Sequence, residues 1–388
     1  MISTGIEFKS FKKKTSVSKI KKIWKSLVYE FSEGNNDLLL SLSKKYKYSF
    51  KFSNLTKFKK QKLFQIIGMG GSSLGAQAIY NFLADKVKKN FLFTNNITLN
   101  KNLKIKEKKF NIMISKSGNT LETLSNLNSQ KIKKNCLFIT ENKQSYLRNL
   151  AFKLQSEVID HNNFIGGRYS VLSETGMVPA YLMGLDPNKF KQFDNLIKNK
   201  KFINCLINNT SSLLKLHNQN KKNSIILNYD ESSNDLFYWY QQLVAESLGK
   251  KSKGILPIVS SVPKDNHSVM QLYLDGFKNN FFTFFYVKEN STQKIDNSSV
   301  LNTHNYLKNK SMSDILFAQF RATQKVFVKK NIPFRTFIIK KRDEKTLGEL
   351  FTFFILETIL LAKAMKINPF DQPAVELIKK ETLKILKN

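Results

Sequence analysis

Two predicted strand-to-helix turns carry residues that could bind an anion. In the first, a strand predicted at 63–68 runs into Gly-Met-Gly-Gly-Ser-Ser-Leu-Gly at 68–75, and a helix follows. Such a turn places free backbone N–H groups and a helix N-terminus against a ligand. A dinucleotide fingerprint would need Gly or Ala in place of Ser73, and a nucleotide-triphosphate loop would need Gly-Lys-Ser/Thr at 75–77. An anion site of another kind and a plain tight turn therefore both stay open.

The second turn, at 115–120, reads Ser-Lys-Ser-Gly-Asn-Thr and follows a strand predicted at 111–114. The hydroxyl groups of Ser115, Ser117 and Thr120, the ammonium group of Lys116 and a glycine that lets the backbone turn suit a phosphate dianion. The alternative is a helix cap with Thr120 at the N-cap position. A cap alone would leave the other three side chains without a role, so the sequence favours phosphate binding.

Four further segments follow these turns in one order. Residues 164–170 read Phe-Ile-Gly-Gly-Arg-Tyr-Ser, and residues 242–250 read Gln-Leu-Val-Ala-Glu-Ser-Leu-Gly-Lys. A histidine ends Pro-Lys-Asp-Asn-His at 263–267, and Asn-Pro-Phe-Asp-Gln-Pro-Ala-Val-Glu-Leu-Ile-Lys lies at 368–379. Each motif alone is modest, but the ordered set is specific. From about residue 62 to the C-terminus, the chain resembles the glucose-6-phosphate isomerase family.

The resemblance implies an α/β fold with two sugar-isomerase domains, each a three-layer α/β/α arrangement around a parallel sheet, plus N- and C-terminal helical segments. It also implies a homodimer with shared active sites and a small sugar phosphate as the substrate. The substrate-binding residues that it implies are Ser72 on the sugar side, Ser115, Lys116, Ser117 and Thr120 at the 6-phosphate, and Gln242 and Gln372.

Four catalytic residues are implied by the same resemblance. Glu246 matches the base of the family, and Arg168 matches the arginine that stabilises the enediolate. His267 matches the histidine that assists ring opening, which in the family comes from the other subunit. Lys379 matches the lysine near the ring oxygen.

Elementary chemistry supports these residue types. Interconversion of an aldose and a ketose moves a proton between C1 and C2, which needs one carboxylate as base and then acid, and a cation for the negative charge of the enediolate. Ring opening needs a separate proton relay, for which a histidine and a lysine are suited. No metal or organic cofactor is required.

Other interpretations stay open for the single residues and for the whole chain. Taken alone, Glu246 could be an exposed helix residue, Arg168 an ion-pair partner and Lys379 a surface lysine. The predicted activity is conversion of D-glucose 6-phosphate to D-fructose 6-phosphate, in glycolysis and gluconeogenesis. The alternatives are a bifunctional phosphoglucose/phosphomannose isomerase and, less favoured, a non-catalytic sugar-phosphate sensor on the same fold.

Hydrophobic patterning predicts the elements that must position these residues. Two alternating strand and helix series indicate two parallel sheets, and Gly184-Leu185-Asp186-Pro187 interrupts the chain between them. The predicted division is an N-terminal helical segment at 1–55, α/β domains at 56–185 and 186–345, and C-terminal helices at 346–388. Strands are expected at 63–68, 91–94, 111–115, 136–140, 157–159, 223–229, 255–260, 281–287 and 334–340.

Composition narrows the class of protein. The 388 residues include 64 Lys and Arg against 29 Asp and Glu, which gives a formal net charge of +35. Only five of the 64 are arginine, the residue that reads bases and grips phosphates by two hydrogen bonds, and the lysines form no single block. We therefore predict no nucleic-acid partner. Two isolated cysteines and the lack of a long apolar run predict no disulfide scaffold, no metal site, no membrane partner and a cytoplasmic location.

Overall fold

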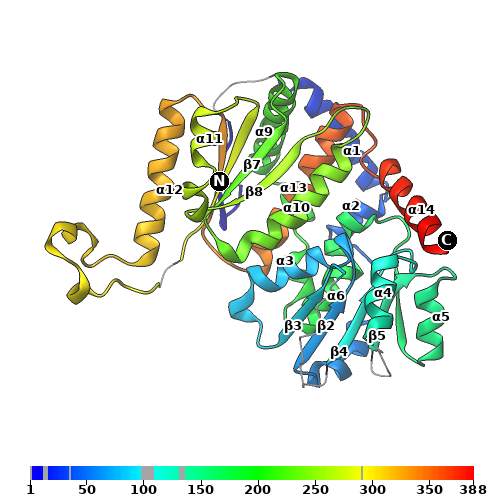
Figure 1. Cartoon of the computed structure of the whole chain (residues 1–388). Helices are drawn as coiled ribbons and strands as arrows, with labels where there is room; N and C mark the ends of the chain where they lie inside the picture. Colours follow the sequence, from blue (N-terminus) through cyan, green and yellow to red (C-terminus); the bar gives the residue numbers. More distant parts are fainter. Residues whose placement is uncertain (1, 12–15, 35, 98–108, 131–135, 290–291) are drawn as a thin grey trace.

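The computed structural model describes residues 2–11, 16–34, 36–97, 109–130, 136–289 and 292–388, and two five-stranded sheets organise them (Figure 1). The first sheet has the order β3-β2-β4-β5-β6, and all of its strands are parallel. Three of its strands are mostly buried, as expected for a parallel sheet covered on both faces. Its strands are β2 (Leu63–Ile67), β3 (Asn90–Thr94), β4 (Phe110–Ile114), β5 (Cys136–Glu141) and β6 (Glu157–His161).

The second sheet has the order β1-β10-β9-β7-β8. Four strands are parallel: β7 (Asn223–Asn228), β8 (Leu256–Ser261), β9 (Asn280–Val287) and β10 (Phe334–Ile339). The fifth, β1 (Ile6–Lys9), lies antiparallel on the edge and pairs Ile6 with Ile339. The sequence predicted only helices in this N-terminal segment, so the prediction missed the strand. Four residues are too few to show a period of two, and only the pairing with β10 defines them.

Alternate side chains of each sheet face different helices, so each sheet is the middle of three layers. In the second sheet, Phe282 and Phe284 face α11 (Met270–Asp275) and α12 (Met312–Lys329), while Phe281 and Phe285 face the opposite core. In the first sheet, one face meets α4 (Leu121–Ser129) and α5 (Tyr146–Lys153). The predicted fold class is confirmed.

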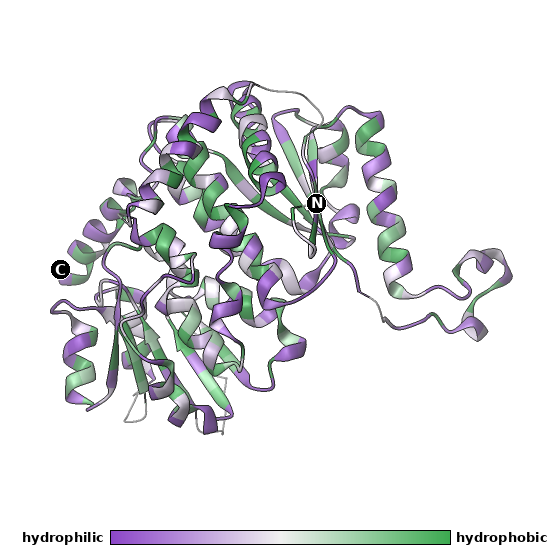
Figure 2. Ribbon diagram, turned by 180° about the vertical axis from the view of Figure 1, so that it is seen from behind, coloured by the Kyte–Doolittle hydropathy of each residue, from purple (hydrophilic) through white to green (hydrophobic). Residues whose placement is uncertain are grey.

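One hydrophobic core joins the inner faces of the two sheets. It contains α3 (Leu74–Phe82), α6 (Glu174–Leu182), α9 (Lys200–Asn218), α10 (Asn234–Leu248) and α13 (Glu344–Ala364). Figure 2 shows that hydrophobic residues follow the strands and these inner helices, whereas hydrophilic residues cover the outside. Helices α3 and α10 pack against each other where the two sheets meet (Figure 1). A residue on α10 can therefore reach the turns of the first sheet.

The remaining elements surround this body. Helices α1 (Ser18–Ser32) and α2 (Asp37–Ser41) precede the first sheet, and α7 (Pro187–Phe190) and α8 (Phe193–Leu196) connect the two sheets. The segment 292–311 extends away from the second sheet as an arm, in yellow at the left of Figure 1. The chain ends in α14 (Pro373–Lys387), which has no buried residue. No described helix has the length and apolar character needed to cross a membrane.

Candidate active site

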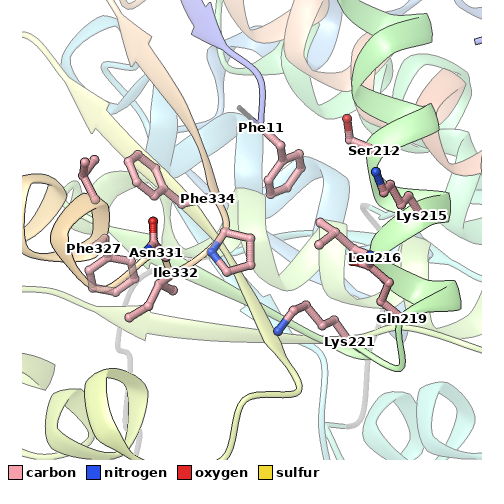
Figure 3. A pocket seen from close by; sticks show the side chains of 12 residues that line it. Phe11, Ser212, Lys215, Leu216, Gln219, Lys221, Phe327, Asn331, Ile332 and Phe334 are labelled. Atoms are coloured by element: carbon pink, nitrogen blue, oxygen red, sulfur yellow. The ribbon is translucent and has the colours of Figure 1, made fainter. Parts of the chain in front are cut away.

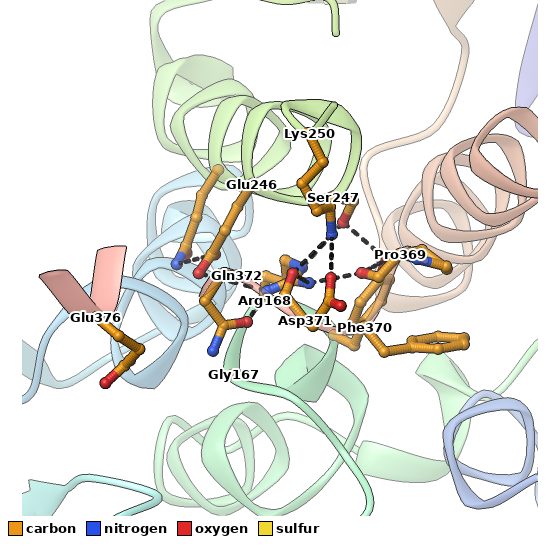
Figure 4. A network of polar contacts seen from close by, with 12 residues as sticks. Gly167, Arg168, Glu246, Ser247, Lys250, Pro369, Phe370, Asp371, Gln372 and Glu376 are labelled. Atoms are coloured by element: carbon orange, nitrogen blue, oxygen red, sulfur yellow. Dashed lines mark hydrogen bonds and ion pairs between the residues drawn. The ribbon is translucent and has the colours of Figure 1, made fainter. Parts of the chain in front are cut away.

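Arg168 occupies the centre of a polar network between the two sheets (Figure 4). It lies on the 3₁₀ helix Gly167–Leu172, and only 3% of its side chain is exposed. Its Nε donates to Ser247 Oγ at 2.9 Å and its Nη1 donates to Gln372 Oε1 at 2.8 Å. Its Nη2 donates to the carbonyl oxygens of Pro369 and Asp371 at 2.5 and 3.1 Å. The structure thus joins two predicted residues, Arg168 and Gln372, that are 204 positions apart.

Glu246 faces this guanidinium group from α10. Its Oε1 lies 3.4 Å from Arg168 Nη1, and 23% of its side chain is exposed. Gln242, one helical turn earlier, donates from Nε2 to Glu246 Oε2 at 3.0 Å. One carboxylate oxygen is therefore held by an amide and the other faces a buried cation, which fixes the orientation of the carboxylate.

The glycine-rich turn at 68–75 packs directly against Gln242 and against the backbone next to Arg168. Gly70 has φ +53°, and a Cβ atom there would lie 2.8 Å from Gln242 Nε2. A Cβ atom on Gly71 would lie 2.1 Å from the carbonyl of Gly167, next to Arg168. Only glycine at these positions therefore lets the glycine-rich turn come this close to Gln242 and to the backbone of Gly167. Ser72 follows in the same turn and is half-buried, and its side chain makes no described hydrogen bond.

The second turn, between β4 and α4, gathers the hydroxyl groups predicted to hold a phosphate. Ser115 is buried and its Oγ lies 2.8 Å from Thr120 Oγ1. Thr120 occupies the N-cap position of α4, but its side chain makes no capping hydrogen bond. Gly118 turns the backbone at φ +65°, and Ser117 is exposed. The hydroxyls therefore do not serve the helix as a cap, which was the alternative interpretation.

Lys116 has local partners in this turn. Its Nζ donates to the carbonyl oxygen of Asn163 at 2.8 Å and lies 3.5 Å from Glu141 Oε1. About a third of the side chain is exposed. The ammonium group therefore stands at the surface of the turn, where an incoming anion would compete with the Glu141 carboxylate.

Two predicted catalytic residues are not brought to the network. His267 is exposed at the end of the 3₁₀ helix Lys264–His267, and no described hydrogen bond joins it to Arg168 or Glu246. Lys379 lies on α14 with 63% of its side chain exposed, and it pairs with Glu376 at 2.6 Å. Figure 4 shows Glu376 at the margin of the network, on the helix that follows Gln372.

The structure adds residues that the sequence analysis missed. Tyr169 Oη lies 2.8 Å from Ser247 Oγ and donates to the Pro369 carbonyl at 3.1 Å. Burial raises the pKa of Tyr169, which keeps it a neutral donor. Lys250 donates to the carbonyl and carboxylate of Asp371 and lowers the pKa of that carboxylate. Ser247 and Tyr169 each adjoin a predicted residue in the chain, and that adjacency was the available signal.

One cavity lies beside the Arg168–Glu246 network, and another lies away from it. One of about 530 Å³ opens beside Gln242, between α3 and α10, with an amide-rich lining that includes Gln77, Asn95 and Gln241. Another, of about 480 Å³, has apolar walls that include Phe327 and Phe334 and contains no predicted site residue (Figure 3). Within the described ranges, no three His, Cys, Asp or Glu side chains are grouped closely enough to hold a metal ion.

Comparisons with known proteins identify the family. The family model described as phosphoglucose isomerase matches residues 53–388. A glucose-6-phosphate isomerase from Methanocaldococcus jannaschii is 32% identical over 359 residues, which cover 86% of this chain and 87% of the relative. One from Campylobacter jejuni is 31% identical over 353 residues, covering 83% of this chain and 84% of the relative.

Solved structures show the same fold. A hypothetical protein from Thermus thermophilus superposes with a TM-score of 0.75 at 22% identity, covering 87% of this chain and 88% of that one. A glucose-6-phosphate isomerase from Chlamydia trachomatis superposes with a TM-score of 0.67 at 19% identity, covering 87% of this chain and 72% of that one.

Proposed function

Because the chain belongs to the phosphoglucose isomerase family, we propose that it interconverts D-glucose 6-phosphate and D-fructose 6-phosphate at the Arg168–Glu246 pair. The enzyme is an aldose–ketose isomerase, and the reaction passes through a cis-enediolate. The observation that carries the assignment of the site is a partly exposed carboxylate, held by Gln242, that lies 3.4 Å from a buried guanidinium group. A base and a cation for the developing charge are thus adjacent.

Glu246 is the group that moves the proton. As a carboxylate it removes the proton from C2 of the open-chain aldose and returns it to C1 of the enediolate, so that one residue acts first as base and then as acid. Its hydrogen bond from Gln242 fixes one oxygen, and the other oxygen is the one that faces Arg168. Both oxygens therefore have defined positions before the substrate arrives.

Arg168 stabilises the enediolate with a donor that is already in position. Four of its five N–H groups donate to protein oxygens, two of them from Nη2. Nη1 is also the Arg168 nitrogen that lies 3.4 Å from Glu246 Oε1. An oxygen of the enediolate that approaches Glu246 comes close to this positively charged group, and the buried surroundings strengthen the attraction.

The 6-phosphate binds at the Ser115–Thr120 turn in this proposal. The paired hydroxyls of Ser115 and Thr120, the exposed Ser117, and the N-terminus of the nine-residue α4 supply donors. Lys116 adds charge at the edge. Ser72, Gln242 and Gln372 then lie on the sugar side, whereas Lys379 stays outside the set that the geometry supports.

The test is a coupled assay of fructose 6-phosphate conversion with glucose-6-phosphate dehydrogenase. Glu246→Gln should lower kcat by ~10²-fold or more with little change in KM, because the carboxylate acts mainly in the transition state. Glu231→Gln, on an exposed carboxylate, is the matched control. Near-normal kcat in Glu246→Gln would remove Glu246 from the mechanism. Wild-type protein that binds fructose 6-phosphate without converting it would favour the sensor, and comparable turnover of mannose 6-phosphate would favour the bifunctional enzyme.

We further propose a homodimer in which His267 serves the active site of the other subunit. The exposure of His267 supports this, as does the extended arm, on which Leu301 and Tyr306 are 73% and 67% exposed. Such large exposed apolar side chains are typical of an interface. A cytoplasmic location and a place in glycolysis and gluconeogenesis remain predictions.

Complementation between two inactive variants tests this arrangement. Differently tagged Glu246→Gln and His267→Ala chains are co-expressed, and the mixed dimer is isolated by both tags. If His267 acts across the interface, one site of the mixed dimer carries both changes and the other carries none, so about half of the wild-type kcat per dimer returns. No recovery in an isolated mixed dimer would place His267 in its own subunit's site.

A further inference from the structure

We propose that Lys191 and Glu174 form a buried positioning pair that holds the 3₁₀ helix Gly167–Leu172, and through it Arg168, in the catalytic geometry. The inference rests on the proposed function for its catalytic consequence. Neither residue belongs to a motif that the sequence analysis singled out, and neither contacts Arg168 directly. Both are almost fully buried, at 2% and 1% exposure.

Lys191 lies between α7 and α8, and its ammonium group links two separate segments. Its Nζ donates to the carbonyl oxygen of Ser41, at the end of α2, and to the carbonyl oxygen of Leu172. Leu172 is the last residue of the 3₁₀ helix that carries Arg168. The same Nζ lies 4.9 Å and 5.0 Å from the ring centroids of Tyr46 and Tyr48. The C-terminal end of that 3₁₀ helix is therefore tied to the N-terminal part of the chain.

Glu174 follows two residues after Leu172 and provides the opposite charge. Its two carboxylate oxygens accept from Tyr46 Oη at 2.9 and 3.1 Å. Burial raises the pKa of Glu174, while its hydrogen bonds and the nearby Lys191 lower it. Burial lowers the pKa of Lys191 to about 7, and Glu174 opposes that shift. Tyr46 lies between the two charged groups, because its Oη donates to Glu174 and its ring lies against Lys191 Nζ.

Burial of a charged lysine side chain costs free energy, so Lys191 is expected to do more than fill space. An apolar side chain of similar length would fill the same space without removing a charge from water. Unlike an apolar side chain, Lys191 donates directional hydrogen bonds, and these fix two backbone carbonyls relative to each other. The other partners of Arg168 come from α10 and from the turn at 369–372. A shift of the 3₁₀ helix would therefore move Arg168 relative to Glu246, and a displacement of ~1 Å can cost ~10²-fold in rate.

The test uses Lys191→Met, with Lys189→Met on the exposed face of α7 as the matched control. Lys191→Met should lower kcat for fructose 6-phosphate by ~10-fold or more, with KM within ~3-fold of wild type. Glu174→Gln keeps an acceptor for Tyr46 and should lower kcat in the same direction. If the pair acts as one unit, the fold-decrease in kcat of the double variant is smaller than the product of the fold-decreases of the two single variants. A kcat within ~2-fold of wild type in Lys191→Met would overturn the proposal.

A second readout does not depend on turnover. Hydrogen–deuterium exchange of peptides that cover residues 166–173 should be faster in Lys191→Met than in wild type, and unchanged in Lys189→Met. If the wild type fails to isomerise fructose 6-phosphate, the proposed function fails, while this exchange still decides whether Lys191 holds the segment. Equal exchange in the two variants would refute the positioning role. Should Lys191→Met fail to fold, Glu174→Gln is judged by the same two measurements.

Discussion

Replacement of Arg168 by lysine separates the shape of the guanidinium group from its charge. The guanidinium group donates four hydrogen bonds from three nitrogen atoms, to Ser247, Gln372 and the carbonyls of Pro369 and Asp371. A lysine ammonium group donates from a single atom, so it cannot reach acceptors on all sides of the guanidinium plane. We expect at least two of the four hydrogen bonds to be lost.

The magnitude follows from these losses. A hydrogen bond to a charged group contributes about 1.5–3 kcal/mol, so two of them correspond to about 3–6 kcal/mol. The free energy of unfolding should fall by about 3 kcal/mol, the lower end, because Asp371 and Gln372 are partly open to water that can replace the lost partner. The donor that faces Glu246 is also displaced, and removal of one donor to a developing oxyanion costs ~10²–10³ in kcat. KM should stay within ~3-fold, since the phosphate turn is untouched.

The assay is the dehydrogenase-coupled measurement of kcat and KM, with urea unfolding on the same samples. Arg321→Lys is the matched control, because Arg321 lies on α12 and its Nη1 contacts only Gln324 among the described hydrogen bonds. A folded Arg168→Lys protein that keeps kcat within tenfold of wild type would refute the role given to the guanidinium geometry.

Three further outcomes are expected. Arg335→Met should lower the free energy of unfolding by about 3–5 kcal/mol in urea, because it leaves Glu357 buried without its cation; a loss below about 1 kcal/mol would contradict this. Lys116→Ala should chiefly raise KM for fructose 6-phosphate, because the phosphate does not react, and a loss of kcat alone would contradict phosphate binding. Burial lowers the pKa of His161 to about 4, so the unfolded chain binds more protons between pH 4 and 6.5 and the wild-type free energy of unfolding should fall as pH drops through that window. His161→Gln should make the free energy of unfolding less dependent on pH in that window, and the same pH dependence in variant and wild type would contradict the role given to His161.

Hydrophobic patterning predicted most of the fold because nine of the ten described strands in the two sheets pair in parallel and mostly come from apolar runs. The strand expected at 281–287 is β9, Asn280–Val287, and every residue in it is buried. Such a run stands out from the helices around it. The edge strand β1 was missed because its pairing with β10 is a contact between residues more than 300 positions apart, which no local pattern contains.

Motifs located the centre of the candidate site but not its supports. Arg168, Glu246, Gln242 and Gln372 meet in one network, and their spacing in the sequence gives no distance between them. Ser247 was not singled out because a serine beside a predicted catalytic residue has no distinctive chemistry until its partner is known. The position of Lys379 depends on how α14 sits against the body, and α14 has no buried side chain to fix it.

The most direct test of the central claim follows the proton itself. Fructose 6-phosphate is incubated with the enzyme in D₂O, and NMR monitors glucose 6-phosphate and the deuterium content at its C2. We expect interconversion with deuterium appearing at C2, because the proton held by Glu246 can exchange with solvent, and we expect Glu246→Gln to slow both processes by ~10²-fold or more. An unchanged rate of interconversion in Glu246→Gln would contradict proton transfer by this carboxylate, whereas a lack of deuterium alone would show only that the proton is returned faster than it exchanges with solvent.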